Sequence, residues 1–135
     1  MNTKEKVIKV KEVMTPGVKT IDGLATVADA IQSMKAKKYG ALIVDRRNEH
    51  DEYGLITVQS IARNVIEKNL SPERVHIYEI MNKPFLSVRP DMNIRYAIRL
   101  LEQIDHGRAL VIEDGKAVGI VTMYDMVIHY MDSIA

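Results

Sequence analysis

The apolar residues of this chain alternate between two patterns. Residues 41–44 and 109–112 form short, continuous apolar runs, which are typical of buried β-strands. After Thr26 and Asn93, apolar residues recur at helical spacing, and each of these two polar residues is a good helix N-cap. The predicted buried helix faces consist of Val27, Ala30, Ile31 and Met34 after Thr26, and of Ile94, Ala97, Ile98 and Leu101 after Asn93.

The two patterns occur twice, in the same order, which indicates a duplication. Met14-Thr15 and Met81-Asn82 open the two halves at an offset of 81 − 14 = 67 residues. Residues 54–57 match residues 119–122 at an offset of 65; the segment before them has nine residues (45–53) in the first half and six (113–118) in the second. Loops tolerate such length changes more readily than cores.

Each half therefore reads as strand, helix, strand, strand, helix. The extended stretches 18–21 and 85–88 come first; the strand pairs are 41–44 with 55–58 and 109–112 with 118–123. The sequence Asp114-Gly115 predicts a tight hairpin turn in the second pair. The closing helices carry Ile61, Ala62, Val65 and Ile66 in the first half, and Met126, Val127, Tyr130 and Met131 in the second.

One β-α-β-β-α unit is too small to cover both faces of its sheet. We therefore expect an α/β (α+β) fold in which two such repeats pack through their sheets with approximate two-fold symmetry, leaving a cleft between them. The predicted organisation is an N-terminal extension (1–9), a first repeat (10–70) and a second repeat (71–135).

Composition limits the function. The 135 residues include no Cys, and 19 Lys and Arg balance 18 Asp and Glu for a net charge of +1, so no overall field attracts nucleic acid or anionic lipid. The N-terminus has no apolar stretch long enough for a signal peptide, and no apolar run approaches the length of a membrane span. We expect a soluble, cytoplasmic protein.

Catalytic chemistry is poorly supported. The chain has no cysteine nucleophile and no activated-serine motif, and its four His, at 50, 76, 106 and 129, lack metal-ligand spacing. The common glycine-rich phosphate loops are also missing. We therefore predict no catalytic residues, no metal site and no obligatory cofactor.

The segment Gly119-Ile120-Val121-Thr122-Met123-Tyr124-Asp125 is the strongest candidate for a binding site. In one interpretation, Thr122 and Asp125 form a helix-capping box. In the other, the Thr122 hydroxyl and the free helix N–H groups bind phosphate, and the Asp125 carboxylate accepts both hydroxyls of a ribose. Spacing alone leaves both interpretations open.

The repeated β-α-β-β-α order, the openings Met-Thr-Pro and Met-Asn-Lys-Pro, and the closing Thr-Met-Tyr-Asp together resemble the CBS domain family over residues 10–132. The resemblance implies a tandem CBS pair. Such pairs are generally regulatory sensors of adenosyl ligands such as AMP, ADP, ATP or S-adenosylmethionine, are not enzymes in themselves, and commonly form a homodimeric disc of four repeats.

The same resemblance implies the roles of particular residues. Thr122 would meet phosphate, Asp125 the ribose, and Arg108 the phosphates, although Arg108 could equally be a solvated charge at a strand edge. Ile120 belongs to the same strand. The residues implied around the adenine are Val18, Lys19, Thr20, Lys38, Tyr39, Gly40 and Ala41.

The first repeat departs from this pattern because Ser60 stands where the family's ribose-binding Asp belongs. A serine cannot present two charged acceptor oxygens. One competent nucleotide site per chain is therefore predicted, and a second cleft is expected to be impaired. The residues around that second cleft are Thr57, Ser60, Phe85, Ser87 and His106.

Two functions remain open. The first is a non-catalytic sensor of an adenosine-containing ligand, with AMP, ADP or ATP favoured over S-adenosylmethionine or NAD. The second is a ligand-free dimerisation or scaffold module that controls an unknown partner protein. In both, a homodimer is expected because the last helix has more apolar residues than one buried face requires. These residues are Met126, Val127, Ile128, Tyr130, Met131 and Ile134.

Overall fold

The computed structural model describes residues 6–37, 40–104 and 107–134, which fold into two compact units. The central unit is Lys19–Phe85, and the terminal unit joins Met1–Val18 to Leu86–Ala135. The predicted repeat boundary at residues 70 and 71 lies inside the central unit. The predicted repeat boundaries and the packing of the repeats through their sheets stay predictions.

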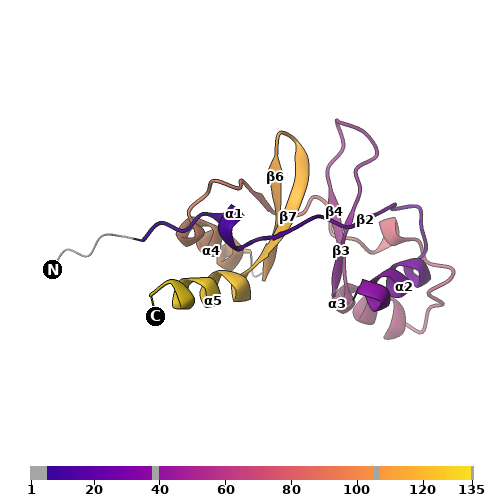
Figure 1. Ribbon diagram of the computed structural model, residues 1–135. Helices are drawn as coiled ribbons and strands as arrows, with labels where there is room; N and C mark the ends of the chain where they lie inside the picture. Colours follow the sequence, from indigo (N-terminus) through magenta and orange to yellow (C-terminus); the bar gives the residue numbers. More distant parts are fainter. Residues whose placement is uncertain (1–5, 38–39, 105–106, 135) are drawn as a thin grey trace. The chain divides into compact units, whose positions relative to one another are not determined.

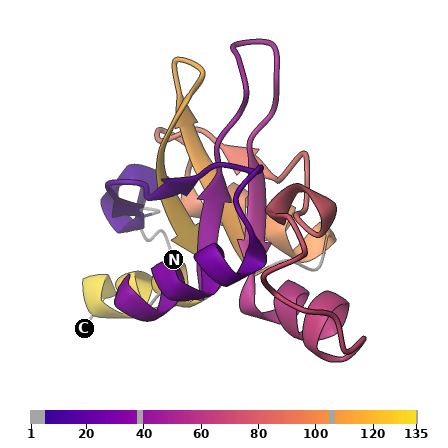
Figure 2. The same cartoon turned by 90° about the vertical axis from the view of Figure 1, so that its right-hand side faces the viewer.

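The central unit contains a three-stranded sheet in the order β2-β3-β4, with β2 parallel and β4 antiparallel to β3. Its helices pack on this sheet around a core that includes Leu42, Ile56 and Ile77 (Figure 2). The elements are β2 (Thr20–Ile21), α2 (Val27–Lys37), β3 (Ala41–Val44), β4 (Gly54–Thr57), α3 (Val58–Ile61), a π-helix (Ala62–Ile66) and a 3-10 helix (Ile77–Glu79).

The terminal unit contains a four-stranded sheet in the order β1-β7-β6-β5. Helices α4 and α5 lie on one face of the β6–β7 hairpin, over a core that includes Leu101, Val111 and Met126 (Figure 1). Its elements are α1 (Val10–Val13), β1 (Thr15–Pro16), β5 (Ser87–Val88), α4 (Ile94–Gln103), β6 (Arg108–Glu113), β7 (Lys116–Thr122) and α5 (Met123–Ile134).

The predicted β-α-β-β-α order is confirmed in both repeats, as β2-α2-β3-β4-α3 and β5-α4-β6-β7-α5. The predicted turn is also confirmed: Asp114 and Gly115 have φ values of 52° and 77°, as expected for a tight hairpin turn with two positive φ angles. The closing helices differ. The first changes after Ile61 to π-type bonding, in which the Glu67 N–H donates to the Ala62 carbonyl at 2.8 Å, whereas α5 continues to Ile134.

Both predicted N-caps are present. The Asn93 side chain accepts a hydrogen bond from the Arg95 N–H at 3.0 Å. Thr26 forms a reciprocal capping box: its hydroxyl accepts from the Asp29 N–H at 3.2 Å, and the Asp29 carboxylate accepts from the Thr26 N–H at 3.0 Å. The Asp29 carboxylate is therefore used by its own helix.

The segments that open the two repeats are exchanged, and no local sequence pattern predicts this exchange. Residues 8–16, the first opening segment, bind the second repeat through Val10 N–H to Met92 carbonyl and Ile94 N–H to Ile8 carbonyl bonds. Residues 75–83, the second opening segment, bind the first repeat in the matching way. Their bonds run from Ile77 N–H to the Ala25 carbonyl and from Val27 N–H to the Val75 carbonyl.

Each opening segment then crosses a glycine in the second hairpin strand of the other repeat. Thr15 pairs with Ile120, and Asn82 pairs with Leu55. A Cβ atom on Gly119 would lie 2.7 Å from the Thr15 carbonyl oxygen and 2.9 Å from the Met14 sulfur. A Cβ atom on Gly54 would lie 2.9 Å from the Met81 sulfur and 3.2 Å from the Asn82 carbonyl oxygen. The recurring Met and Gly are thus partners in contact.

The second opening segment has an additional ionic anchor on the loop between β3 and β4. Lys83 Nζ lies 2.7 Å from one Asp51 carboxylate oxygen and 2.9 Å from the other. The Arg47 N–H and Nε also donate to this carboxylate, at 2.9 and 3.2 Å. The Lys83 ammonium, followed by the Arg47 backbone N–H, holds the pKa of Asp51 well below its ordinary value. Pro16 occupies the position equivalent to Lys83 in the first opening segment.

Candidate functional site

The strongest candidate site lies where β7 ends and α5 begins. Thr122 is the last residue of β7, and its hydroxyl accepts a hydrogen bond from the Asp125 N–H at 3.0 Å. The Met123 N–H donates to the Gly107 carbonyl at 2.9 Å, which holds the helix start against the beginning of β6. The Thr122 half of the predicted capping box is therefore present, and the Thr122 hydroxyl lies at the start of a twelve-residue helix.

Asp125 differs from Asp29, although both lie three residues after a capping threonine. The Asp29 carboxylate closes its box by accepting from the Thr26 N–H. The half-buried Asp125 forms no such return bond: within the described part of the chain, its carboxylate has no hydrogen bond or ion pair. A half-buried carboxylate without partners can accept hydrogen bonds from a ligand.

Arg108 lies beside this corner. It is the first residue of β6 and pairs directly with Thr122 across the hairpin, in a half-buried position. Ile120 is two residues before Thr122, so both side chains lie on the same face of β7. The structure therefore brings together a cation, a hydroxyl, a carboxylate and an apolar side chain. This set of groups suits a ligand with phosphate and hydroxyl groups.

The residues assigned to the adenine side are divided between the two units. Val18 is half-buried in the terminal unit, whereas Lys19, Thr20, Gly40 and Ala41 belong to the central unit. In the parallel pair of β2 and β3, Thr20 lies opposite the buried Ile43, two residues after Ala41. Lys38 and Tyr39 lie outside the described residues. The role of all seven residues in binding stays a prediction.

The residues of the predicted second cleft have other surroundings. Ser60 is only 7% exposed, and its N–H donates to the Thr57 hydroxyl at 3.0 Å. Its own hydroxyl donates to the Ile80 carbonyl at 2.7 Å. Phe85 is buried in the central unit, and Ser87 is exposed on β5 in the terminal unit. His106 lies outside the described residues.

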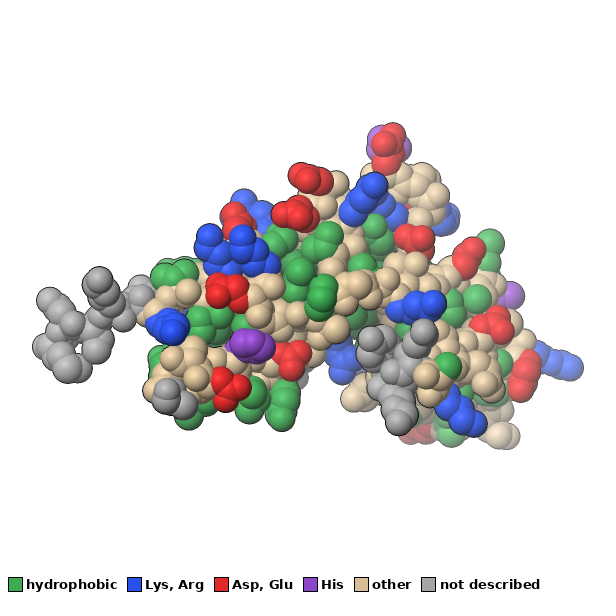
Figure 3. Space-filling model, in the orientation of Figure 1, with side chains coloured by type: hydrophobic (Ala, Val, Ile, Leu, Met, Phe, Trp, Pro, Cys, Tyr) green, Lys and Arg blue, Asp and Glu red, His purple; other side chains and the backbone are tan. Residues whose placement is uncertain are grey.

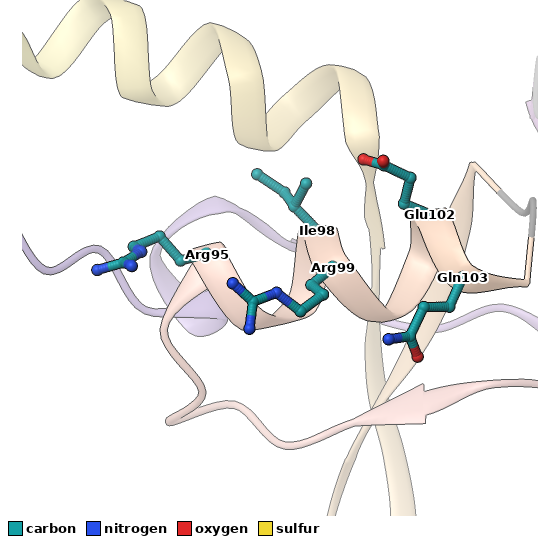
Figure 4. A pocket seen from close by; sticks show the side chains of 5 residues that line it. All are labelled: Arg95, Ile98, Arg99, Glu102 and Gln103. Atoms are coloured by element: carbon teal, nitrogen blue, oxygen red, sulfur yellow. The ribbon is translucent and has the colours of Figure 1, made fainter.

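A neighbouring surface feature of the terminal unit was not found by sequence reasoning. A groove of about 580 Å³ runs between α4 and α5, and its apolar lining includes Ile98, Val127 and Met131. A second hollow of about 340 Å³ continues along α4, with Arg95, Arg99, Glu102 and Gln103 around Ile98 (Figure 4). The guanidinium groups of both arginines lie over Tyr96, at 5.7 and 5.8 Å from its ring centre. In the sequence, the helical spacing of Arg95 and Arg99 is the one feature that could have indicated this hollow.

Two other properties bear on function. Among the described residues, no group of three or more His, Asp or Glu side chains is arranged to hold a metal ion. None of the helices in the described ranges is long and apolar enough to cross a membrane.

Two β-α-β-β-α repeats with exchanged opening segments define a tandem α/β module. The chain belongs to the CBS domain family, whose model matches residues 10–67 and 77–132, and it forms a CBS pair.

Comparisons with known proteins agree with this assignment. An uncharacterised protein of Methanopyrus kandleri is 30% identical over 121 residues, which cover 88% of this chain and 61% of that protein. An uncharacterised protein of Methanocaldococcus jannaschii is 24% identical, with 64% of this chain and 46% of that protein covered. The chain thus spans about half the length of these two curated relatives.

A solved structure gives a closer match. The hexameric CBS-CP12 protein from bloom-forming cyanobacteria is 39% identical, with a TM-score of 0.87, covering 93% of this chain and 73% of that one.

Proposed function

We propose that this CBS pair is a non-catalytic regulatory module that binds an adenosine-containing ligand at the corner formed by Arg108, Ile120, Thr122 and Asp125. AMP, ADP and ATP are the favoured ligands, ahead of S-adenosylmethionine and NAD, and no obligatory cofactor is needed. The carboxylate of Asp125, which its own helix does not use, is the observation that carries the proposal.

The chemistry of the corner supports a nucleotide over a simple anion. Arg108 and the positive end of the α5 dipole favour phosphate, whereas a carboxylate repels it. The carboxylate therefore needs a donor, and the two hydroxyls of a ribose supply a matched pair. The same fold holds 5-methylthioadenosine and S-adenosyl-L-methionine in another solved CBS domain pair, which is 20% identical with a TM-score of 0.81 and covers 95% of this chain and 99% of that one. At 20% identity, this likeness shows a shared fold only.

Calorimetry with AMP, ADP and ATP tests the proposal. We expect saturation at about one nucleotide per chain. Asp125→Ala should weaken binding by about 10- to 150-fold, because hydrogen bonds to a charged group contribute about 1.5–3 kcal/mol. Asp29→Ala is the matched control: it removes the other carboxylate three residues after a capping threonine and should leave affinity unchanged. Equal effects of both variants, or two nucleotides per chain, would contradict the proposal.

A second candidate function, a ligand-free scaffold, is favoured by the apolar surface of α5. Val127, Tyr130, Met131 and Ile134 are 44–54% exposed, and apolar side chains reach the surface over this helix (Figure 3). A thermal-shift series separates the two functions, because a ligand that binds only the folded state raises the melting temperature with its concentration. A shift with any adenosyl compound supports the sensor, and no shift with all of them supports the scaffold.

The same surface supports the predicted homodimer as a proposal. The related CBS-CP12 protein is described as hexameric, which is a larger assembly than a dimer. Sedimentation equilibrium should give the mass of a dimer for this chain, and Met131→Glu should shift it toward the monomer, because a buried carboxylate without partners is unfavourable at an apolar interface. A wild-type monomer at all concentrations would contradict the homodimer.

A further inference from the structure

The Ser60 side chain forms a hydrogen-bonded link, or tie, between α3 and another segment of the central unit. Its hydroxyl donates to the Ile80 carbonyl at 2.7 Å and accepts from the Asn64 side-chain amide at 3.3 Å. Ser60 is 7% exposed, so these bonds satisfy a buried polar group. The Ile80 carbonyl belongs to the second opening segment, residues 75–83, which has crossed onto the first repeat. The serine therefore anchors an exchanged segment.

The equivalent position in the terminal unit is Asp125, and the carbonyl equivalent to that of Ile80 is that of Val13. The hydrogen bonds on both sides of these two carbonyls match. Before them, the Val10 N–H to Met92 carbonyl bond corresponds to the Ile77 N–H to Ala25 carbonyl bond. After them, the Met14 N–H to Val10 carbonyl bond corresponds to the Met81 N–H to Ile77 carbonyl bond.

An ionised carboxylate at position 125 cannot make the serine's bond. It has no proton to donate to a carbonyl oxygen, and two acceptor oxygens repel each other. A hydroxyl at this position can turn inward and donate, whereas a carboxylate has to find donors elsewhere. The two uses exclude each other for one side chain.

We propose that the residue three positions after the strand-ending threonine decides between two roles. Ser60 is a positioning residue whose hydroxyl holds the second opening segment. Asp125 makes no such bond to the first opening segment and instead accepts hydrogen bonds from the ligand. The ligand part of this inference rests on the function proposed above, whereas the tie does not.

One consequence concerns the first opening segment, residues 8–16. Within the described residues it has neither a counterpart of the Ser60 bond nor, with Pro16 in place of Lys83, a counterpart of the ion pair with Asp51. It nevertheless pairs with the ligand-binding strand, because Thr15 lies opposite Ile120. The first opening segment therefore lacks two side-chain contacts that hold the second, and it lies against the candidate site.

Hydrogen exchange read by mass spectrometry on the full chain tests the tie without any ligand. Ser60→Ala should lower the protection of residues 77–83 about five- to tenfold, the loss expected for one net hydrogen bond. Ser60→Thr keeps a hydroxyl and should retain that protection. Asp125→Ser should raise the protection of residues 8–16 by a similar factor, whereas Asp125→Ala should not.

Calorimetry with AMP on the same proteins tests the ligand role, since Asp125→Ser and Asp125→Ala should both weaken AMP binding. Unchanged protection in Ser60→Ala, or equal protection of residues 8–16 in the two Asp125 variants, would overturn the inference. If the wild type binds no nucleotide but the exchange results appear as expected, the proposed function fails and the tie stands. If nucleotide binds but the exchange results do not appear, only the inference fails.

Discussion

The corner after Thr57 and the corner after Thr122 are built alike up to their third residue. In both, the threonine hydroxyl caps the following helix by accepting an N–H three residues on. Ser60 then bonds inward to the Ile80 carbonyl, whereas Asp125 has a carboxylate without a partner among the described residues. Similar caps thus lead to a structural hydrogen bond in one repeat and to a carboxylate without a partner among the described residues in the other.

The closing helices of the two repeats also differ in how much apolar surface they expose. Val65, near the end of the π-helix, is fully buried, whereas its equivalent in α5, Tyr130, is 44% exposed. In the central unit the chain turns back after the π-helix, and the Pro72 carbonyl accepts from the Ala28 N–H at 3.0 Å. This bond holds the chain after the π-helix against the start of α2. The terminal unit has an exposed apolar helix surface on α5 and a first opening segment without a counterpart of the Ser60 bond among the described residues.

The largest expected effect distinguishes the two glycine crossings. Gly119→Ala should destabilise the fold by about 1–3 kcal/mol, the usual cost of overpacking, because the added Cβ would lie 2.7 Å from a backbone oxygen that cannot easily move. Gly54→Ala should cost less, because its closest contact is the flexible Met81 sulfur at 2.9 Å. Urea unfolding of both variants measures the difference. A larger loss of stability in Gly54→Ala than in Gly119→Ala would contradict this prediction.

The next effect separates capping from binding. Thr122→Ala and Thr26→Ala should each cost about 1 kcal/mol of stability, as expected for a lost N-cap. Only Thr122→Ala should also weaken AMP binding, because Thr26 caps a helix outside the candidate site. Thermal unfolding measures the stability of the two variants, and calorimetry measures their AMP affinity. Thr122→Ser keeps the hydroxyl and should retain both the stability and the affinity of the wild type. Weaker AMP binding in Thr26→Ala would remove the distinction between the two caps.

The smallest effect concerns acid. Because the pKa of Asp51 is lower in the folded state than in the unfolded chain, its pairing with Lys83 stabilises the fold above the unfolded pKa of about 3.9. This contribution is lost as the pH falls below that value toward the folded pKa. The melting temperature of Asp51→Asn should therefore lie below that of the wild type at pH 6, and the gap should narrow at pH 3.

Asp91 provides the control for the acid experiment, because its side chain is 65% exposed and lies 3.6 Å from Arg89. Asp91→Asn should change the melting temperature less than Asp51→Asn at pH 6. If the difference in melting temperature between Asp51→Asn and the wild type is the same at pH 6 and pH 3, the ion pair of Asp51 with Lys83 does not anchor the central unit.

Much of the local structure could be predicted from single stretches of sequence. The helix starts at Thr26 and Asn93, the Asp114-Gly115 turn and the apolar strands depend on neighbouring residues, so pattern reasoning found them. The candidate corner was found for the same reason, since Thr122 and Asp125 are three residues apart. The groove between α4 and α5 was missed, because it depends on how two distant helices pack.

The sequence by itself determined the duplication, the order of elements within each repeat and the family, because these depend on periodicity and on an ordered set of motifs. Only the tertiary structure decided which repeat each opening segment joins and how the third residue after each threonine is used. The physical reason is distance along the chain. The Val10 N–H bonds to a carbonyl at Met92, and the Ser60 hydroxyl to one at Ile80, and no local pattern encodes such partners.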